Sequence, residues 1–234
     1  MTNKTQLIYL LYNIRMNNVV NYFIIHCKQH TERLSNLEKI KAILNTPITI
    51  FEGYYTKLIS TEYNIKLKYY TDHDSNMSMP VNIQTKSGEI GCYLSHHMLI
   101  KHIMDKANKD EYSVIFEDDV TFKSPIGYDI EKVIKNMKLK NIDWDIIFLG
   151  NIGKNHGTHI IDNIYTIDKT SICAGTHALL INNQNAEKIY KTNCEIINAI
   201  DHQYKINIDT GKLNGYVMFR PICFQDREYI SNIQ

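Results

Sequence analysis

Near its beginning, the sequence places a helical pattern between two short apolar runs, and this arrangement constrains the fold more than any other feature. Residues 22–25 and 48–51 have the length and composition of buried strands. From Thr31, apolar residues recur at spacings of three and four, which predicts an amphipathic helix that Pro47 ends. A strand–helix–strand unit predicts two parallel strands joined by a right-handed crossover.

The rest of the chain continues the alternation of helical patterns and apolar runs. Further strands are predicted at 112–116, 144–149, 174–181 and 217–219, and helices at 87–107, 126–137 and 186–191. Residues 54–87 and 151–170 are predicted as loops, and residues 1–20 as a leader or an added helix. We therefore expect residues 21–234 to form one α/β domain with a mostly parallel sheet.

Charge and cysteine usage exclude several classes of protein. Lys and Arg number 26 against 25 Asp and Glu, a net charge of +1, so no nucleic-acid partner is expected. No apolar run reaches the roughly 20 residues that span a bilayer. Five cysteines at irregular spacings, without a CxxC pair, argue against a disulfide framework or a structural zinc site. We expect a reducing compartment, the cytoplasm, with peripheral membrane association left open.

Three consecutive acids, Glu117-Asp118-Asp119, directly follow the apolar run Val114-Ile115-Phe116. A buried strand that ends in carboxylates presents them at the edge of the sheet where α/β folds bind ligands. Successive side chains of a strand alternate between its faces, so we expect Glu117 and Asp119 on one face and Asp118 on the other. An acid-x-acid pair of this kind can hold Mg²⁺ or Mn²⁺ beneath a diphosphate. The alternative is a solvated turn after the strand.

Two other segments carry residues that could bind or react. Gly88 and Gly91 begin a helical pattern and would allow close approach of an anion, or would serve only as caps. His96 lies on the apolar stripe of that helix, as a core histidine would, and the same helix contains no HxxxH pair. Asp201-His202 could supply a general base and a metal ligand, or could simply close a helix at its C-terminus.

Several of these blocks resemble glycosyltransferase family 25, which includes lipooligosaccharide and collagen galactosyltransferases. The central match is GEIGCYLSHHMLIKHI followed by YSVIFEDDV. The order of the other blocks is also similar: YFIIHCKQHTERLSNL, WDIIFLG, AGTHALLINNQNAEKIY, IDHQ and the tail RPICFQDREYISNIQ. One departure is the end of the first strand, where the family has Ile-Asn-Leu and this chain has Ile25-His26-Cys27.

The resemblance implies a GT-A fold and an inverting, metal-dependent transfer of galactose or glucose from a UDP-sugar to a hydroxyl of a glycan or of hydroxylysine in a collagen-like protein. It implies Mn²⁺ or Mg²⁺ held by Glu117 and Asp119, with His202 as a third ligand or as an orienting residue. Asp201 is the expected catalytic base. The expected donor-binding residues are His26, Arg33, Gly91, Ser95, His96 and Asp118.

Two rival functions stay open at this stage. One is a catalytically inactive relative that keeps the fold and serves in binding or adhesion. The other is a metal-dependent phosphoesterase that uses the same acids, although such sites gather more acids and histidines from neighbouring loops.

Overall fold

The computed structural model describes residues 19–55, 87–123, 126–154 and 157–226. The strands are β1 (Val20–His26), β2 (Ile48–Glu52), β3 (Tyr112–Glu117), β4 (Val120–Phe122), β5 (Ile146–Phe148), β6 (His159–Ile161), β7 (Ile164–Thr166), β8 (Ala178–Asn182), β9 (Gly215–Met218) and β10 (Cys223–Gln225). The helices are α2 (Leu34–Leu44), α4 (Ser87–Lys106), α5 (Ile126–Leu139), α6 (Ala186–Thr192) and α7 (Ile200–Asp209), with short 3₁₀ turns at η1 (Thr31–Arg33) and η2 (Asn183–Asn185).

Eight strands form one mixed sheet in the order β2-β1-β3-β8-β5-β9-β7-β6, and β4 pairs with β10 in a separate two-stranded sheet. The pairs β1–β2, β1–β3 and β5–β9 are parallel. Only β7 and β8 run against the direction shared by the other strands of the large sheet. The predicted α/β class with a mostly parallel sheet is confirmed, and the arrangement is consistent with a Rossmann-like GT-A fold.

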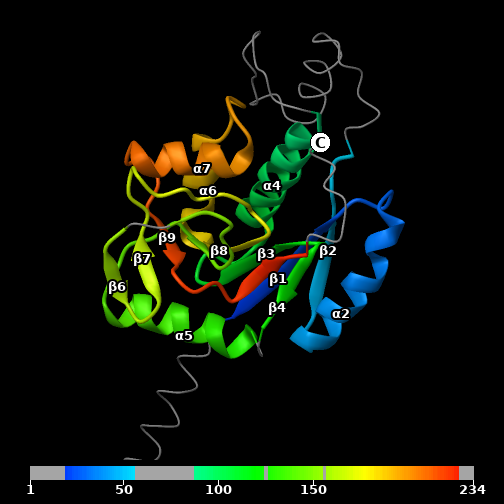
Figure 1. Cartoon of the computed structure of the whole chain (residues 1–234), viewed down its shortest axis with the longest axis horizontal. Coiled ribbons are helices and arrows are strands. Elements are labelled where there is room, and N and C mark those ends of the chain that lie inside the picture. The colour runs from blue at the N-terminus through cyan, green and yellow to red at the C-terminus, as the bar shows by residue number, and fades with distance from the viewer. Residues whose placement is uncertain (1–18, 56–86, 124–125, 155–156, 227–234) are drawn as a thin grey trace, which may run out of the picture.

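The sheet is covered by helices on both faces, so the molecule has three layers (Figure 1). Side chains alternate between the faces along each strand. Ile25 and Ile115 belong to the core under α4, α6 and α7. Ile24 and Val114 belong to the second core, under α2 and α5. This alternation explains why the central strands are apolar throughout: both of their faces are buried.

The strand–helix–strand unit predicted at the start of the chain is confirmed. β1 and β2 are parallel, and α2 connects them. The helix ends before Pro47, because Asn45 adopts a left-handed conformation with φ of 46° and donates its N–H to the carbonyl of Lys41. The helix predicted from residue 87 and the strand that ends in the acids also form.

Two predictions about local structure are wrong. Asp201 and His202 do not close a helix; they lie in the first turn of α7. The apolar residues before them, Ile196 and Ile197, lie outside helices in the segment between α6 and α7. The predicted loop at 151–170 contains the short strands β6 and β7, which extend the sheet. The predicted leader at 1–20 lies almost wholly outside the described residues, as does most of the loop at 54–87.

No helix among the described residues is both long enough and apolar enough to cross a lipid bilayer.

Candidate active site

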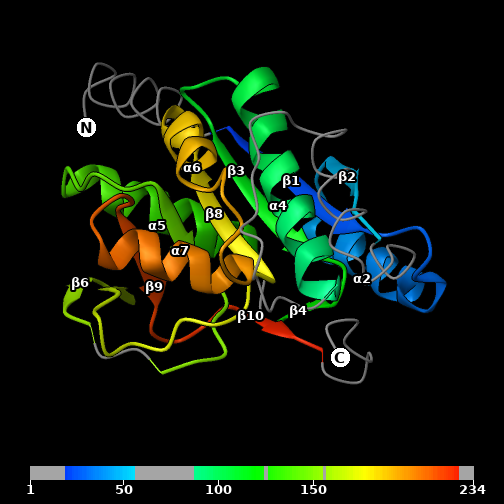
Figure 2. The ribbon, with the colours of Figure 1, turned by 90° about the horizontal axis from the view of Figure 1, so that it is seen from above.

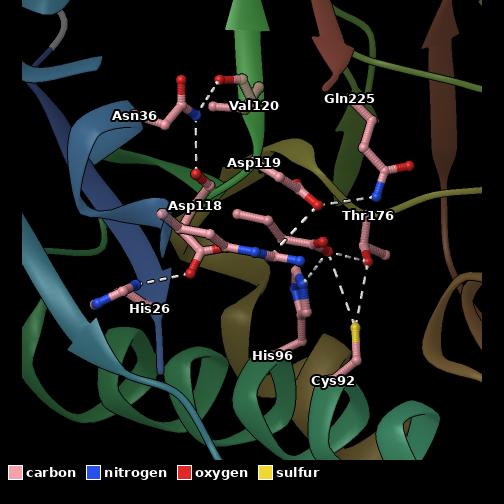
Figure 3. A network of polar contacts seen from close by, with 11 residues as sticks. His26, Asn36, Cys92, His96, Asp118, Asp119, Val120, Thr176 and Gln225 are labelled. Carbon is pink, nitrogen blue, oxygen red and sulfur yellow. Dashed lines mark hydrogen bonds and ion pairs between the residues drawn. The ribbon is translucent and has the colours of Figure 1, made fainter. Parts of the chain in front are cut away.

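The three acids leave the end of β3 in three different directions. β3 ends at Glu117, and Asp118 and Asp119 form a turn before β4. Asp118 points toward His26, and Asp119 points toward Gln225 (Figure 3). Glu117 contacts side chains of α4 and the segment before β8. The alternation of a strand therefore holds only as far as Glu117, and each acid has its own surroundings.

Asp118 is buried in a cluster with two basic side chains. Nδ1 of His26, at the end of β1, donates to Oδ2 of Asp118 at 2.7 Å. Arg33, in the turn before α2, donates to Oδ1 through its guanidinium. The side chains of Arg33 and Asp118 are 8% and 5% exposed, so the pair lies in a region of low dielectric constant. Three residues expected to bind the donor thus bind one another.

The turn that follows Asp118 is fixed through its backbone. The side-chain amide of Asn36 donates to the carbonyls of Asp118 and Val120, at 2.9 and 3.0 Å. The carbonyl of Asp119 accepts the N–H of Asp226 at 2.7 Å, where β10 ends. α2 and the end of β10 therefore hold the acids from two sides (Figure 3). Figure 2 shows β10 lying beside β4, the strand that follows the turn. A turn held in this way needs little further ordering when a ligand binds.

Asp119 has one carboxylate oxygen in contact with protein groups and one without. Oδ2 accepts Nε2 of Gln225 at 3.1 Å and lies 3.5 Å from the guanidinium of Arg33. Oδ1 is buried and has no hydrogen-bond partner among the described residues. Burial, and then the charge of Glu117, raise the pKa of Asp119 to about 7, against the opposing effects of Gln225 and Arg33. A buried carboxylate oxygen without a partner is costly, and a bound cation would satisfy it.

Glu117 receives its contacts through one oxygen. Nε2 of His96 and the hydroxyl of Thr176 donate to Oε1 at 3.0 and 2.6 Å, and Sγ of Cys92 lies 3.9 Å from the same atom. Burial raises the pKa of Glu117, but the hydrogen bonds and charge of His96, with Thr176, outweigh it and lower the pKa to about 2. The side chain is 20% exposed, so Glu117 is an accessible carboxylate held in one orientation.

Asp201 contacts the segment before β8, which also contacts Glu117. Its Oδ2 accepts the backbone N–H of Gly175 at 2.8 Å, and its Oδ1 accepts the N–H of His202 at 2.8 Å. The side chain of Asp201 is half-buried, and that of His202 is exposed. Thr176 follows Gly175 directly, so Asp201 and Glu117 are bound by consecutive residues. His202 is not part of the group of ligand atoms around Glu117.

Gly91 and Ser95 connect α4 to the end of β2. The hydroxyl of Ser95 donates to the carbonyl of Gly91 at 2.7 Å and accepts the N–H of Tyr54 at 2.8 Å. Both residues are buried. Their contacts hold the first turns of α4 against the chain that leaves β2, which keeps His96 in place beside Glu117.

Sequence reasoning missed several residues of this site. The sequence pattern gives Cys92 no role in the site, and it includes Thr176 in the strand predicted at 174–181, whereas β8 begins at Ala178. α4 contains no HxxxH pair, but Cys92 and His96 have the same i, i+4 spacing and lie on one face of the helix. That spacing was the available signal. Gln225 belonged to the tail that resembles the family, without an assigned role.

The α/β arrangement is consistent with a Rossmann-like GT-A fold, and comparison with known proteins identifies the family. The family model described as glycosyltransferase family 25 (LPS biosynthesis protein) matches residues 19–204. This chain belongs to glycosyltransferase family 25.

Curated relatives agree with this assignment over part of the chain. Procollagen galactosyltransferase 1-B of Xenopus laevis is 26% identical over 133 residues, and procollagen galactosyltransferase 2 of Homo sapiens is 29% identical over 133 residues. Each match covers 55% of this chain and 20% of the relative. The inactive glycosyltransferase 25 family member 3 of Mus musculus is 35% identical over 63 residues, which are 27% of this chain and 10% of the relative. The chain spans about a fifth of the length of the galactosyltransferases it matches.

Proposed function

We propose that this protein is an inverting glycosyltransferase that moves galactose or glucose from a UDP-sugar to an acceptor hydroxyl, with Mn²⁺ or Mg²⁺ as cofactor. Membership of family 25 supports the reaction class. The observation that carries the proposal is the pair of carboxylates where β3 ends, Glu117 held by α4 and Asp119 with a buried oxygen that lacks a partner among the described residues.

The donor set fits a hard divalent cation. Carboxylate oxygens are the ligands that Mg²⁺ and Mn²⁺ prefer. Glu117 and Asp119 would hold the ion, Asp119 through Oδ1 and Glu117 through the oxygen that His96 and Thr176 do not occupy. When bound, the cation neutralises the charge that develops on the departing diphosphate. His202, which is exposed in the first turn of α7, remains the proposed third ligand.

Asp201 is the proposed general base. It would accept the proton of the acceptor hydroxyl as that oxygen attacks the anomeric carbon from the face opposite the leaving diphosphate. The hydrogen bond from Gly175 fixes one carboxylate oxygen of Asp201. Each carboxylate oxygen keeps a further lone pair for an incoming proton.

His26, Arg33 and Asp118 have a positioning role in this proposal. Their mutual contacts hold the turn that carries Asp119, and Arg33 also lies beside Asp119. A cationic guanidinium at that point would favour the negatively charged diphosphate of the donor.

Donor and acceptor are proposed from the relatives. Two of them are named procollagen galactosyltransferases, so UDP-galactose is the first donor to test and UDP-glucose the second. The proposed acceptor is a hydroxyl of a glycan or of hydroxylysine in a collagen-like protein.

The test is a UDP-release assay with Mn²⁺, run with UDP-galactose and UDP-glucose and with glycan and hydroxylysine acceptors. We expect acceptor-dependent release that EDTA abolishes and that Asp119→Ala and Asp201→Asn each reduce by at least about a hundredfold. Asp201→Asn with near wild-type transfer would remove Asp201 from the role of base. Mn²⁺-dependent activity that survives in Asp119→Ala would exclude the proposed metal site.

A second candidate is a binding protein without transfer activity. The similarity to a relative named as inactive favours it. Thermal-shift measurements with UDP, with and without Mn²⁺, separate the two. A transferase should be stabilised by UDP more strongly when Mn²⁺ is present, whereas the absence of coupled stabilisation favours the binding protein.

A further inference from the structure

Three side chains of different chemistry converge beside the carboxylate pair. Sγ of Cys92, Nε2 of His96 and a carboxylate oxygen of Glu117 all lie within 4.8 Å of one another. Cys92 and His96 rise from successive turns of α4, and Sγ of Cys92 lies 3.8 Å from the hydroxyl of Thr176 (Figure 3). Nε2 of His96 points to Glu117. Thiolate, imidazole and carboxylate together make a donor set unlike that of the oxygen site proposed for Mn²⁺.

We propose that Cys92, His96 and Glu117 form a binding site for Zn²⁺ or a similar thiophilic divalent cation. Zinc sites combine thiolate, imidazole and carboxylate ligands, whereas Mg²⁺ and Mn²⁺ favour oxygen. Binding replaces the thiol proton of Cys92 with the cation, and that proton passes to the solvent. Nε2 of His96 must also give up its proton, so that it can bind the cation while the neutral ring keeps a proton on Nδ1. Three protein ligands leave the fourth tetrahedral position for water or substrate.

The distances fit a tetrahedral ion. Zinc bonds of about 2.3 Å to sulfur and about 2.0–2.1 Å to nitrogen and oxygen place two ligands about 3.3–3.6 Å apart. The sulfur of Cys92 lies 3.9 Å from Oε1 of Glu117, and Nε2 of His96 lies 3.0 Å from it. Shifts of a few tenths of an ångström, well within side-chain rotation, would bring these atoms to coordination distances.

The helix that carries two of the ligands is held rigidly. Tyr93, between Cys92 and His96, is fully buried, and its hydroxyl donates to the carbonyl of Asn193 at 3.0 Å. Ser95 ties the same turns to Tyr54. A ligand pair on a fixed helix loses little conformational entropy when it binds a metal, so the site is preorganised.

Because Glu117 belongs to both sites, zinc should inhibit the transferase; this consequence rests on the proposed function, whereas the binding itself does not. A zinc ion bound between α4 and Glu117 would draw that carboxylate toward Cys92 and His96. Glu117 would then no longer be oriented for the cation beneath the diphosphate. Inhibition should therefore weaken as the concentration of Mn²⁺ rises.

Binding is tested on the full chain with Co²⁺, a spectroscopic substitute for Zn²⁺, in excess Mg²⁺ to fill oxygen-only sites. We expect a sulfur-to-cobalt charge-transfer band that one equivalent of Zn²⁺ abolishes. Cys92→Ser should remove the band. Cys194→Ser, which changes another half-buried cysteine away from the site, should keep it. His96→Gln should retain the thiol but weaken Zn²⁺ binding by at least about tenfold.

The outcomes separate clearly. A band that persists in Cys92→Ser, or its absence from the wild-type protein, overturns the proposal. If melting curves show that Cys92→Ser does not fold, His96→Gln decides the question, and unchanged affinity in that variant overturns the site.

The inhibition is measured as the Zn²⁺ concentration that halves each variant's own Mn²⁺-supported rate. We expect that concentration to rise at least about tenfold in Cys92→Ser and to stay unchanged in Cys194→Ser. Equal inhibition of the two variants would exclude the shared use of Glu117. A protein without transfer activity that still shows the cobalt band would contradict only the proposed function.

Discussion

The backbone N–H of Gly175 donates to Asp201, and the hydroxyl of the next residue, Thr176, donates to Glu117, at 2.8 and 2.6 Å. A single dipeptide thus fixes the proposed base and one of the proposed metal ligands. The N–H of Glu117 also donates to the carbonyl of His177 at 3.1 Å. The relative position of the two carboxylates depends on the conformation of this short segment.

Gly175→Ala should reduce transfer strongly. Gly175 has a φ of +87°, and a Cβ there would lie 3.0 Å from Nδ1 of His177 and from a carbon of Ile152. A left-handed conformation costs a non-glycine residue about 1–2 kcal/mol. Relief of that strain would move the N–H that holds Asp201. We expect kcat to fall at least about tenfold, measured by UDP release.

Gly211→Ala is the matched control. Gly211 has a φ of +71° and open space around its Cβ position, at the end of α7. The Gly211→Ala substitution should lower the free energy of unfolding by a similar amount, about 1–2 kcal/mol, while kcat stays near that of the wild type. An equal loss of activity in both variants would show that general destabilisation, and not the position of Asp201, is responsible.

Thr176→Val should weaken Mn²⁺ binding. The substitution keeps the shape of the side chain but removes the hydroxyl that donates to Glu117. Loss of an outer-shell partner lowers metal affinity by about 10–100-fold. The affinity can be measured by Mn²⁺ titration with electron paramagnetic resonance. Thr176→Ser keeps the hydroxyl and should bind Mn²⁺ like the wild type; equal weakening in both variants would contradict the role of the hydrogen bond.

Asp118→Ala should destabilise the fold by about 3–5 kcal/mol, because it leaves the buried charge of Arg33 without its main partner. Urea unfolding measures the change. Asp105→Ala, on the exposed side of α4, should alter the free energy of unfolding by less than about 0.5 kcal/mol. A loss below about 1 kcal/mol in Asp118→Ala would show that solvent or another group replaces the carboxylate.

The metal-free protein should show a pH dependence of stability that belongs to Asp119. Its pKa is about 7 in the folded protein against 3.8 ordinarily. Between these pH values the folded state binds more protons at Asp119 than the unfolded state does. The contribution of protonated Asp119 to the free energy of unfolding is therefore lost as pH rises from about 4 to about 7. The pKa of Glu117 is lowered to about 2, so its stabilising contribution is lost only in more acidic solution, as pH falls toward 2.

Comparison with Asp119→Asn isolates that contribution. Burial lowers the pKa of His177, which adds a slope of opposite sign near pH 6 in both proteins. We measure the free energy of unfolding of both proteins by urea titration in EDTA and subtract the value of the variant from that of the wild type. This difference should decrease as pH rises from 4 to 7. A constant difference would contradict the raised pKa of Asp119.

Local patterns predicted most of the fold. The β1–α2–β2 unit follows from apolar runs and a helical period within about thirty residues, so no distant contact was needed to find it. β6 and β7 were missed because each has three residues, too few for a period, and they are strands only through pairing with each other and with β9. The start of α7 was missed for a similar reason. Its N-cap residue, Ala199, makes no side-chain cap hydrogen bond, which leaves Asp201 in the first turn as a weak start signal.

The sequence predicted which acidic residues form the site, but it did not predict the directions in which their side chains point. Alternation along a strand places Glu117 and Asp119 together only if the strand continues, whereas the chain turns at Asp118. That turn depends on Asn36 from α2 and on Asp226 after β10, both far away in the sequence. The partners of Glu117 on α4 lie 21 and 25 residues before it, and helical spacing alone could have suggested them.

The reversed direction of β8 has a consequence for how this site can change. β3 carries the chain toward the site and β8 carries it away, since the two neighbours are antiparallel. The connection that enters β8 therefore delivers its last residues, Thr176 and His177, to Glu117, and Gly175 just before them to Asp201. A change in the conformation of that connection would therefore alter the contacts of Glu117 and Asp201 while the strand that carries the acids, and the sheet around it, stayed the same.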